Sequence, residues 1–285
     1  YFGDGHDEAQ MVYNFTLPPL LFYTMVKEDA TVLSQWAKGL YLESANNTFF
    51  NFTASHDGIG VRPLEGILDP AELDELIEIV NANAGQVSYK QNPDGSESPY
   101  ELNITYVDAI LADTSSTRAD KFLASQSIQY ALPGVPASYI HSLLGSRNWV
   151  EGAKQTGRAR TINREKLPVE KLISELNDPD SFRARVFFPY LNLIKTRKKQ
   201  SAFHPNAGFE ILQIDPKVFG IKRYSKDQTI YALTNISSKT ISVSLAETAS
   251  TAQATDLISG AVANTAAFDL NPYQYIWLEE KGEKI

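Results

Sequence analysis

Up to about residue 205, apolar residues follow two alternating patterns, short continuous runs and longer stretches with helical spacing. The aromatic run at 49–54 is typical of a buried strand, as are residues 11–15 and 135–140. Helical spacing, with proline or a capping residue at several starts, predicts helices at 17–25, 30–40, 70–84, 118–132 and 181–200. Strands that alternate with helices are typical of an α/β fold.

Two segments depart from this alternation. The turn Asn92-Pro93-Asp94-Gly95 joins strand-like residues 86–90 and 101–106, which we interpret as an inserted subdomain at about 58–116. After Phe209 the chain becomes a series of short β-type runs, at 210–214, 218–224, 229–236, 240–245, 255–258 and 274–278. The Pro- and Gly-containing residues 203–208 are the predicted linker. We therefore expect an α/β barrel region over 1–205 and a small antiparallel all-β domain over 206–285.

Composition narrows the possible partners. With 43% hydrophobic residues, 21% charged residues and a net charge of −8, the chain is typical of a globular protein, and it has neither a basic surface for nucleic acid nor a polybasic membrane patch. It contains no cysteine, and its 4 histidines form no metal-ligand motif, so we expect no disulfide, metal or cofactor. No signal segment and no apolar run of membrane-spanning length occurs, which favours a cytoplasmic protein acting on a small molecule.

The strongest candidate for chemistry is Ser55-His56-Asp57-Gly58, which follows the predicted strand at 49–54. In α/β barrels, catalytic groups lie where strands end at the carboxyl-terminal mouth. Consecutive side chains on a strand point to opposite faces, so these three residues cannot form a serine-hydrolase triad by themselves. The alternative is an Asp-Gly turn beside a core histidine, and the six residues alone leave both possibilities open.

A second candidate is the polar loop at 142–166. It contains Arg147, Arg158, Arg160 and Arg164 and follows the predicted strand at 135–140. Guanidinium groups bind phosphate and carboxylate through paired hydrogen bonds, so this loop could recognise an anion. Exposed arginines are also common on loops, and simple solvation is the alternative.

Several motifs then carry a family resemblance. The segment Ala54-Ser55-His56-Asp57-Gly58-Ile59-Gly60-Val61-Arg62-Pro63 resembles the last conserved region of the α-amylase superfamily, in its sucrose phosphorylase-like branch. Further matches occur in consistent order at residues 1–5, 12–19, 132–136 and 161–164, and the terminal module is similar at 256–260 and 270–274. The resemblance implies that residues 1–205 are the C-terminal part of a TIM (β/α)8 barrel with an inserted subdomain, followed by the antiparallel β domain.

The same resemblance implies a retaining glycoside phosphorylase, which transfers a glucosyl group between sucrose or a related α-glucoside and phosphate to give glucose 1-phosphate. Such enzymes use an aspartate nucleophile, a glutamate acid/base and a third carboxylate that stabilises the transition state. Asp57 matches the third carboxylate, and His56 accompanies it in substrate binding. Arg160 is implied as the contact to phosphate or acceptor, with Arg164 second. Tyr100 and Asn103 are further substrate-lining candidates, with simple packing as their alternative.

The chain also departs from that family. The strands that would carry the nucleophile and the acid/base precede the segment that matches Tyr1. We therefore expect a C-terminal half that is inactive alone and needs the N-terminal half or self-association. The alternatives are an α-glucosidase or amylase-type hydrolase fragment and a non-catalytic carbohydrate-binding or assembly partner. Residues 145–147 and 156–158 resemble relatives acting on glucosylglycerate or glucosylglycerol more than sucrose-specific ones.

Overall fold

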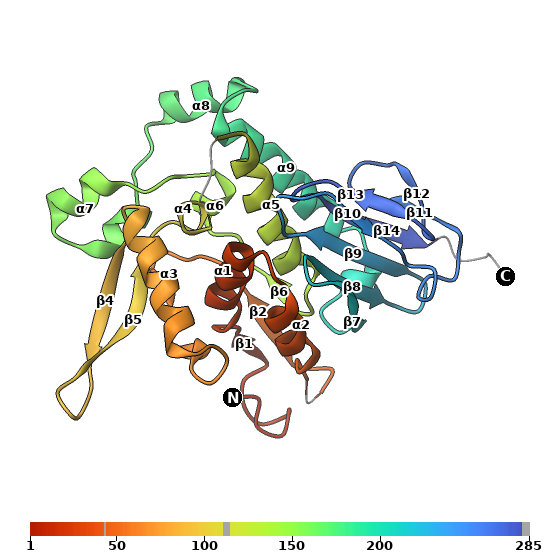
Figure 1. The fold of residues 1–285 in the computed structure, drawn as a ribbon, viewed down its shortest axis with the longest axis horizontal. Coiled ribbons are helices and arrows are strands. Elements are labelled where there is room, and N and C mark those ends of the chain that lie inside the picture. The colour runs from red at the N-terminus through yellow and green to blue at the C-terminus, as the bar shows by residue number, and fades with distance from the viewer. Residues whose placement is uncertain (43, 111–114, 281–285) are drawn as a thin grey trace.

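A computed structural model describes residues 1–42, 44–110 and 115–280. In the first half, a three-stranded parallel sheet has the order β1 (Met11–Tyr13), β2 (Thr48–Asn51), β6 (Val135–Pro136) (Figure 1). Val12 pairs with Phe49, and Phe50 pairs with Val135, so strand order follows chain order. Helices connect these strands, which is the arrangement that parallel pairing requires.

The connecting helices begin where local chemistry predicts. Helix α1 (Leu17–Lys27) has proline in its first turn, and it is followed by α2 (Thr31–Lys38). Helix α3 (Pro70–Ala82) has a complete capping box between Asp69 and Glu72.

The long helices α5 (Ser115–Ala131) and α9 (Phe182–Arg197) pack side by side, with the Phe122 and Tyr190 rings 6.1 Å apart. None of the helices in the described residues has the length and apolarity needed to cross a membrane.

Along the chain, the residues between β2 and α5 form an antiparallel sheet in the order β3 (Ile59–Gly60), β5 (Glu97–Asn103), β4 (Gln86–Gln91). Strands β4 and β5 form the hairpin predicted from the Asn-Pro-Asp-Gly turn. The predicted strand at 101–106 was placed too late, because Thr105 caps the short helix α4 (Tyr106–Ala109) through the Asp108 backbone amide. The short 3-10 helix η1 (Arg62–Leu64) follows β3.

The segment after β6 is more helical than its polar sequence suggested. Strand β6 ends at Pro136 rather than near residue 140, and Ile140 instead opens α6 (Ile140–Leu143). Helix α7 (Val150–Thr156) and the 3-10 helix η2 (Ala159–Asn163) then follow within the predicted loop, before α8 (Val169–Asn177). The sequence prediction of a continuous loop at 142–166 was therefore wrong, because short helices with few apolar residues give little periodic signal.

The C-terminal region is an antiparallel β structure. Its six-stranded sheet has the order β12-β11-β14-β9-β8-β7, and β10 pairs with β13 beside it. The strands are β7 (Gly208–Asp215), β8 (Val218–Tyr224), β9 (Thr229–Asn235), β10 (Ile241–Val243), β11 (Gln253–Asp256), β12 (Val262–Asn264), β13 (Phe268–Leu270) and β14 (Tyr275–Glu280). Figure 1 shows this sheet packed beside α5 and α9.

The predicted linker at 203–208 is buried at its first residue, Phe203, whereas His204 and Asn206 are exposed. The 3-10 helix η3 (Ser201–Phe203) precedes it, and Phe203 is 1% exposed with its ring 4.6 Å from that of Trp277. Buried Arg223 donates to the Ala131 and His204 carbonyl oxygens across the same junction. One hydrophobic core thus runs from the helices of the first half into the C-terminal sheet.

Candidate functional site

Asp57 lies on the loop that follows the carboxyl end of β2. Buried Thr53 anchors the start of this loop by donating to Gln126 Oε1 on α5 (3.0 Å), and the Ser55 hydroxyl accepts from the Asp57 amide (3.1 Å). The Asp57 side chain is 38% exposed, and the neighbouring His56 side chain is 71% exposed. A loop tied at both points holds the carboxylate in place while leaving it open to a ligand.

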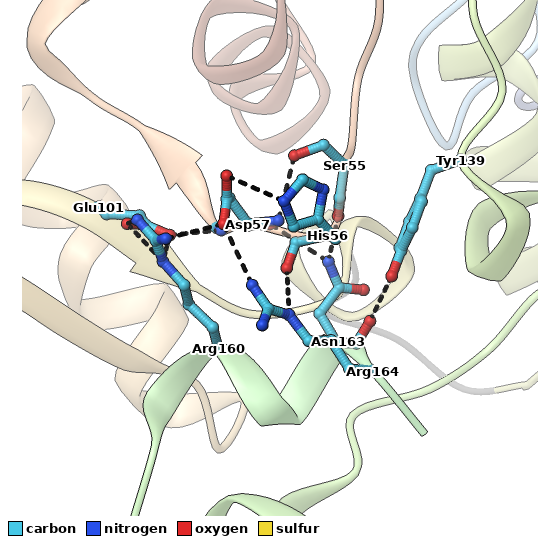
Figure 2. A network of polar contacts seen from close by, with 9 residues as sticks. Ser55, His56, Asp57, Glu101, Tyr139, Arg160, Asn163 and Arg164 are labelled. Atoms are coloured by element: carbon cyan, nitrogen blue, oxygen red, sulfur yellow. Dashed lines mark hydrogen bonds and ion pairs between the residues drawn. The ribbon is translucent and has the colours of Figure 1, made fainter. Parts of the chain in front are cut away.

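Helix η2 and the residue directly after it bring two arginines onto this carboxylate (Figure 2). Arg160 Nη1 is 2.8 Å from Asp57 Oδ1, and Arg164 Nη2 is 3.1 Å from the same oxygen. His56 Nε2 lies 3.6 Å from Asp57 Oδ2. Two guanidinium groups beside one carboxylate make a site that suits an anion as well as a sugar hydroxyl.

Backbone contacts hold η2 against the Asp57 loop. Asn163 Nδ2 donates to the Ser55 carbonyl oxygen (2.6 Å), and Arg164 Nε donates to that of His56 (2.6 Å). From the other side, Tyr139 donates to the Asn163 carbonyl oxygen (2.8 Å). Asn163 and Tyr139 were not among the predicted site residues, although Asn163 stands in the matched motif at 161–164. The Asp57 loop and η2 therefore form one connected unit.

Glu101, near the end of β5, completes the cluster and was missed by sequence reasoning. Its carboxylate accepts hydrogen bonds from Arg160 Nε (3.0 Å) and Nη2 (2.6 Å), and Oε1 accepts another from the Gly58 amide (2.5 Å). Glu101 is 4% exposed. Bonding to this carboxylate raises the pKa of the Arg160 guanidinium. No local sequence signal marked Glu101, because it stands in no recognisable motif.

A cavity of about 550 Å³ opens beside this cluster. Its lining combines apolar and polar groups from the N-terminus, from the segments after β1 and β2, from the small antiparallel sheet with η1, and from η2: Tyr1, Phe15, Pro18, Phe52, Thr53, Ala54, Ser55, Asp57, Gly58, Ile59, Gly60, Arg62, Pro63, Tyr100, Glu101 and Arg160. The lining carboxylates are Asp57 and Glu101. A mixed apolar and polar wall of this kind is typical of a small-molecule site.

The remaining predicted residues divide between the cavity and the scaffold. Tyr100 lines the cavity and is 44% exposed. Asn103 is 1% exposed and donates to Ser88 Oγ within the small sheet. Arg147, one of the loop arginines, donates instead to the buried Asp108 carboxylate (2.5 Å). Among the described residues, no group of three or more His, Asp or Glu side chains is placed to hold a metal ion.

Comparison with known proteins finds relatives that are named as phosphorylases. No model of a known protein family matches the chain. It is 46% identical over 241 residues to a glucosylglycerate phosphorylase of Spirochaeta thermophila (83% of this chain, 41% of that protein). It is 40% identical over 282 residues to a glucosylglycerate phosphorylase of Escherichia coli (98% and 50%). A sucrose phosphorylase of Agrobacterium vitis is 32% identical over 219 residues (73% and 41%).

Solved structures agree at the level of the fold. Sucrose 6F-phosphate phosphorylase from Thermoanaerobacter thermosaccharolyticum superposes with a TM-score of 0.67 at 24% identity, over 79% of this chain and 43% of that one. An Anoxybacillus α-amylase gives a TM-score of 0.62 at 12% identity, over 95% and 48%. The chain spans about half or less of the length of the curated relatives it matches. The chain is thus a homologue of glucosylglycerate and sucrose phosphorylases that matches the carboxyl-terminal portion of those proteins, and it shares its fold with α-amylases.

Proposed function

We propose that this chain forms part of the active site of a retaining glycoside phosphorylase that transfers a glucosyl group between an α-glucoside and inorganic phosphate. The observation that carries the proposal is Asp57, partly exposed on the loop after the parallel strand β2, with Arg160 and Arg164 on its carboxylate. In this proposal Asp57 accepts hydrogen bonds from sugar hydroxyls as positive charge develops on the ring. The arginines bind the phosphate or the acceptor.

We propose glucosylglycerate as the glucosyl donor, with glycerate as the acceptor in the reverse direction. Identities of 40% and 46% to glucosylglycerate phosphorylases exceed the 32% to the sucrose phosphorylase, which supports this choice over sucrose. A glycerate carboxylate would also suit a site with two guanidinium groups.

A retaining mechanism needs one carboxylate as nucleophile and a second as acid/base, and the described cavity offers neither. Asp57 and Glu101 are its lining carboxylates, and both Glu101 oxygens are bound by Arg160. We therefore propose that the nucleophile and the acid/base come from the other strands of a (β/α)8 barrel, to which residues 1–205 contribute, with 206–285 as the accessory β domain.

An aromatic cluster on β1, β2 and the residues directly after them supports this completion. Tyr13, Phe15, Phe50 and Phe52 contact one another, with ring centroids 4.9–5.9 Å apart for the Tyr13 pairs. Tyr13 and Phe15 are each 58% exposed. Parallel sheets are ordinarily covered on both faces, so these rings would pack against the remaining barrel strands.

The test is the release of glucose 1-phosphate from glucosylglycerate and phosphate. The 285 residues are assayed alone and together with the polypeptide that carries the other barrel strands. We expect turnover only in the second assay, with glucosylglycerate preferred to sucrose. Equal rates with water and phosphate as acceptors would indicate a hydrolase and contradict the proposal, and turnover by the chain alone would contradict the need for a second part.

A further inference from the structure

Glu101 occupies an unusual position for a buried acid, because it touches both loops that form the cluster around Asp57. It comes from β5 of the inserted sheet, which otherwise lies apart from the barrel strands. At 4% exposure it is paired with a cation, and that cation is Arg160. Buried carboxylates need such a partner to stay ionised.

The hydrogen bonds at Glu101 fix the direction of the Arg160 guanidinium. The Glu101 carboxylate accepts hydrogen bonds from Arg160 Nε and Nη2. Arg160 Nη1 is therefore the nitrogen that faces Asp57, at 2.8 Å. The Arg160 side chain is itself 45% exposed, so packing alone does little to restrain it. A two-pronged carboxylate contact fixes the plane of a guanidinium far better than a single bond does.

Glu101 also holds the backbone of the Asp57 loop. Its Oε1 accepts from the Gly58 amide at 2.5 Å, one residue after Asp57. At Gly58 an added Cβ would lie 2.7 Å from Glu101 Cγ and 2.5 Å from the Leu102 carbonyl oxygen. This close approach is open only to glycine, and it brings the loop within reach of the carboxylate.

We propose that Glu101 is a positioning residue for glucosyl transfer to phosphate: it orients Arg160 toward Asp57 and the cavity, where the anion binds. This inference rests on the proposed function. Glu101 does not act on the sugar itself, because both its oxygens are already bound. Its removal frees Arg160 to turn away from the cavity and should impair phosphate as acceptor more than water.

The first readout is independent of catalysis. The Nε–Hε resonance of Arg160 is measured by NMR in protein labelled at arginine, and it is identified by its loss in R160K. We expect this resonance to shift and broaden in E101Q and to stay in place in E97Q. Glu97 is the matched control, because it is an exposed glutamate on the same strand. An unchanged resonance in E101Q would overturn the proposal.

The second readout is the ratio of phosphorolysis to hydrolysis of the glucoside by the completed enzyme. We expect E101Q to lower this ratio about 10- to 100-fold, mainly through a higher KM for phosphate, as displacement of a binding group by about 1 Å can do. E101Q should add little further loss in an R160K background. An equal fall of both reactions would reveal a purely structural role and refute positioning. Absence of any turnover by the unmutated enzyme would refute the proposed function instead, and the Arg160 resonance would still decide the role of Glu101.

Discussion

A methyl group added at Gly58 has no room, and this makes Gly58→Ala the sharpest test of how the site is built. The new Cβ would lie 2.5 Å from the Leu102 carbonyl oxygen and 2.8 Å from Glu101 Oε1. The Leu102 oxygen is backbone in the middle of the small sheet, where Ile59 pairs with Leu102, so it cannot move without separating β3 from β5. We expect the loop to shift away from β5.

The cost has two sources. Forcing a methyl group into a filled space costs about 1–3 kcal/mol. Loss of the bond from the Gly58 amide to the Glu101 carboxylate costs about 1.5–3 kcal/mol, as is usual for a bond to a charged group. We therefore expect the free energy of unfolding to fall by about 3–5 kcal/mol, since the two losses occur together. The corresponding fall in Tm is about 6–15 °C.

The assay is thermal and urea unfolding of Gly58→Ala beside Gly60→Ala. Gly60 lies two residues further on, in β3, and an added Cβ there meets nothing within 4 Å. We expect Gly60→Ala to change the unfolding free energy by less than about 0.5 kcal/mol, as most surface substitutions do. If both variants unfold alike, the close approach of Gly58 to β5 is not what holds the loop, and the reasoning is refuted.

Three further outcomes are expected. Asp57→Asn should lower the rate of glucose 1-phosphate release by the completed enzyme about 10²–10³-fold, as loss of a transition-state contact does, with Tm nearly unchanged. Arg223→Met should lower the free energy of unfolding by about 2–4 kcal/mol in urea melts, because it leaves buried carbonyl oxygens without donors. Burial lowers the pKa of His141 below its usual 6.5, so the unfolded chain binds more protons as pH falls and stability is lost on acidification. The Tm of His141→Gln should therefore fall less than that of the unmutated chain between pH 7.5 and about 5.5. The Tm of the exposed control His6→Gln should fall as much as that of the unmutated chain.

The elements with strong local signals were predicted well from sequence. Strand β8 (Val218–Tyr224) has the bounds predicted from its β-branched and aromatic residues, and α3 starts at Pro70 behind the capping residue Asp69. Strands β12 and β13 were not predicted, because three-residue strands carry too little pattern. No local pattern predicted the contacts of Arg197 in the last turn of α9. Its guanidinium donates to the carbonyl oxygens of Tyr130, Gly134 and Phe203, and burial lowers its pKa to about 10.

The candidate site divides in the same way. Asp57 and Arg160 could be proposed because each stands in a recognisable motif, whereas their contact joins positions more than 100 residues apart in the chain. Glu101 had no motif, and its place among the site residues depends on how the β4–β5 hairpin folds back onto the loop after β2. In the sequence, the residue that reflects this contact is Gly58. It must be glycine because the neighbouring strand leaves no room for a side chain, and not because its own turn demands it. A glycine directly after a candidate catalytic residue therefore indicates a close neighbour, and only the tertiary structure identifies that neighbour as the strand that carries Glu101.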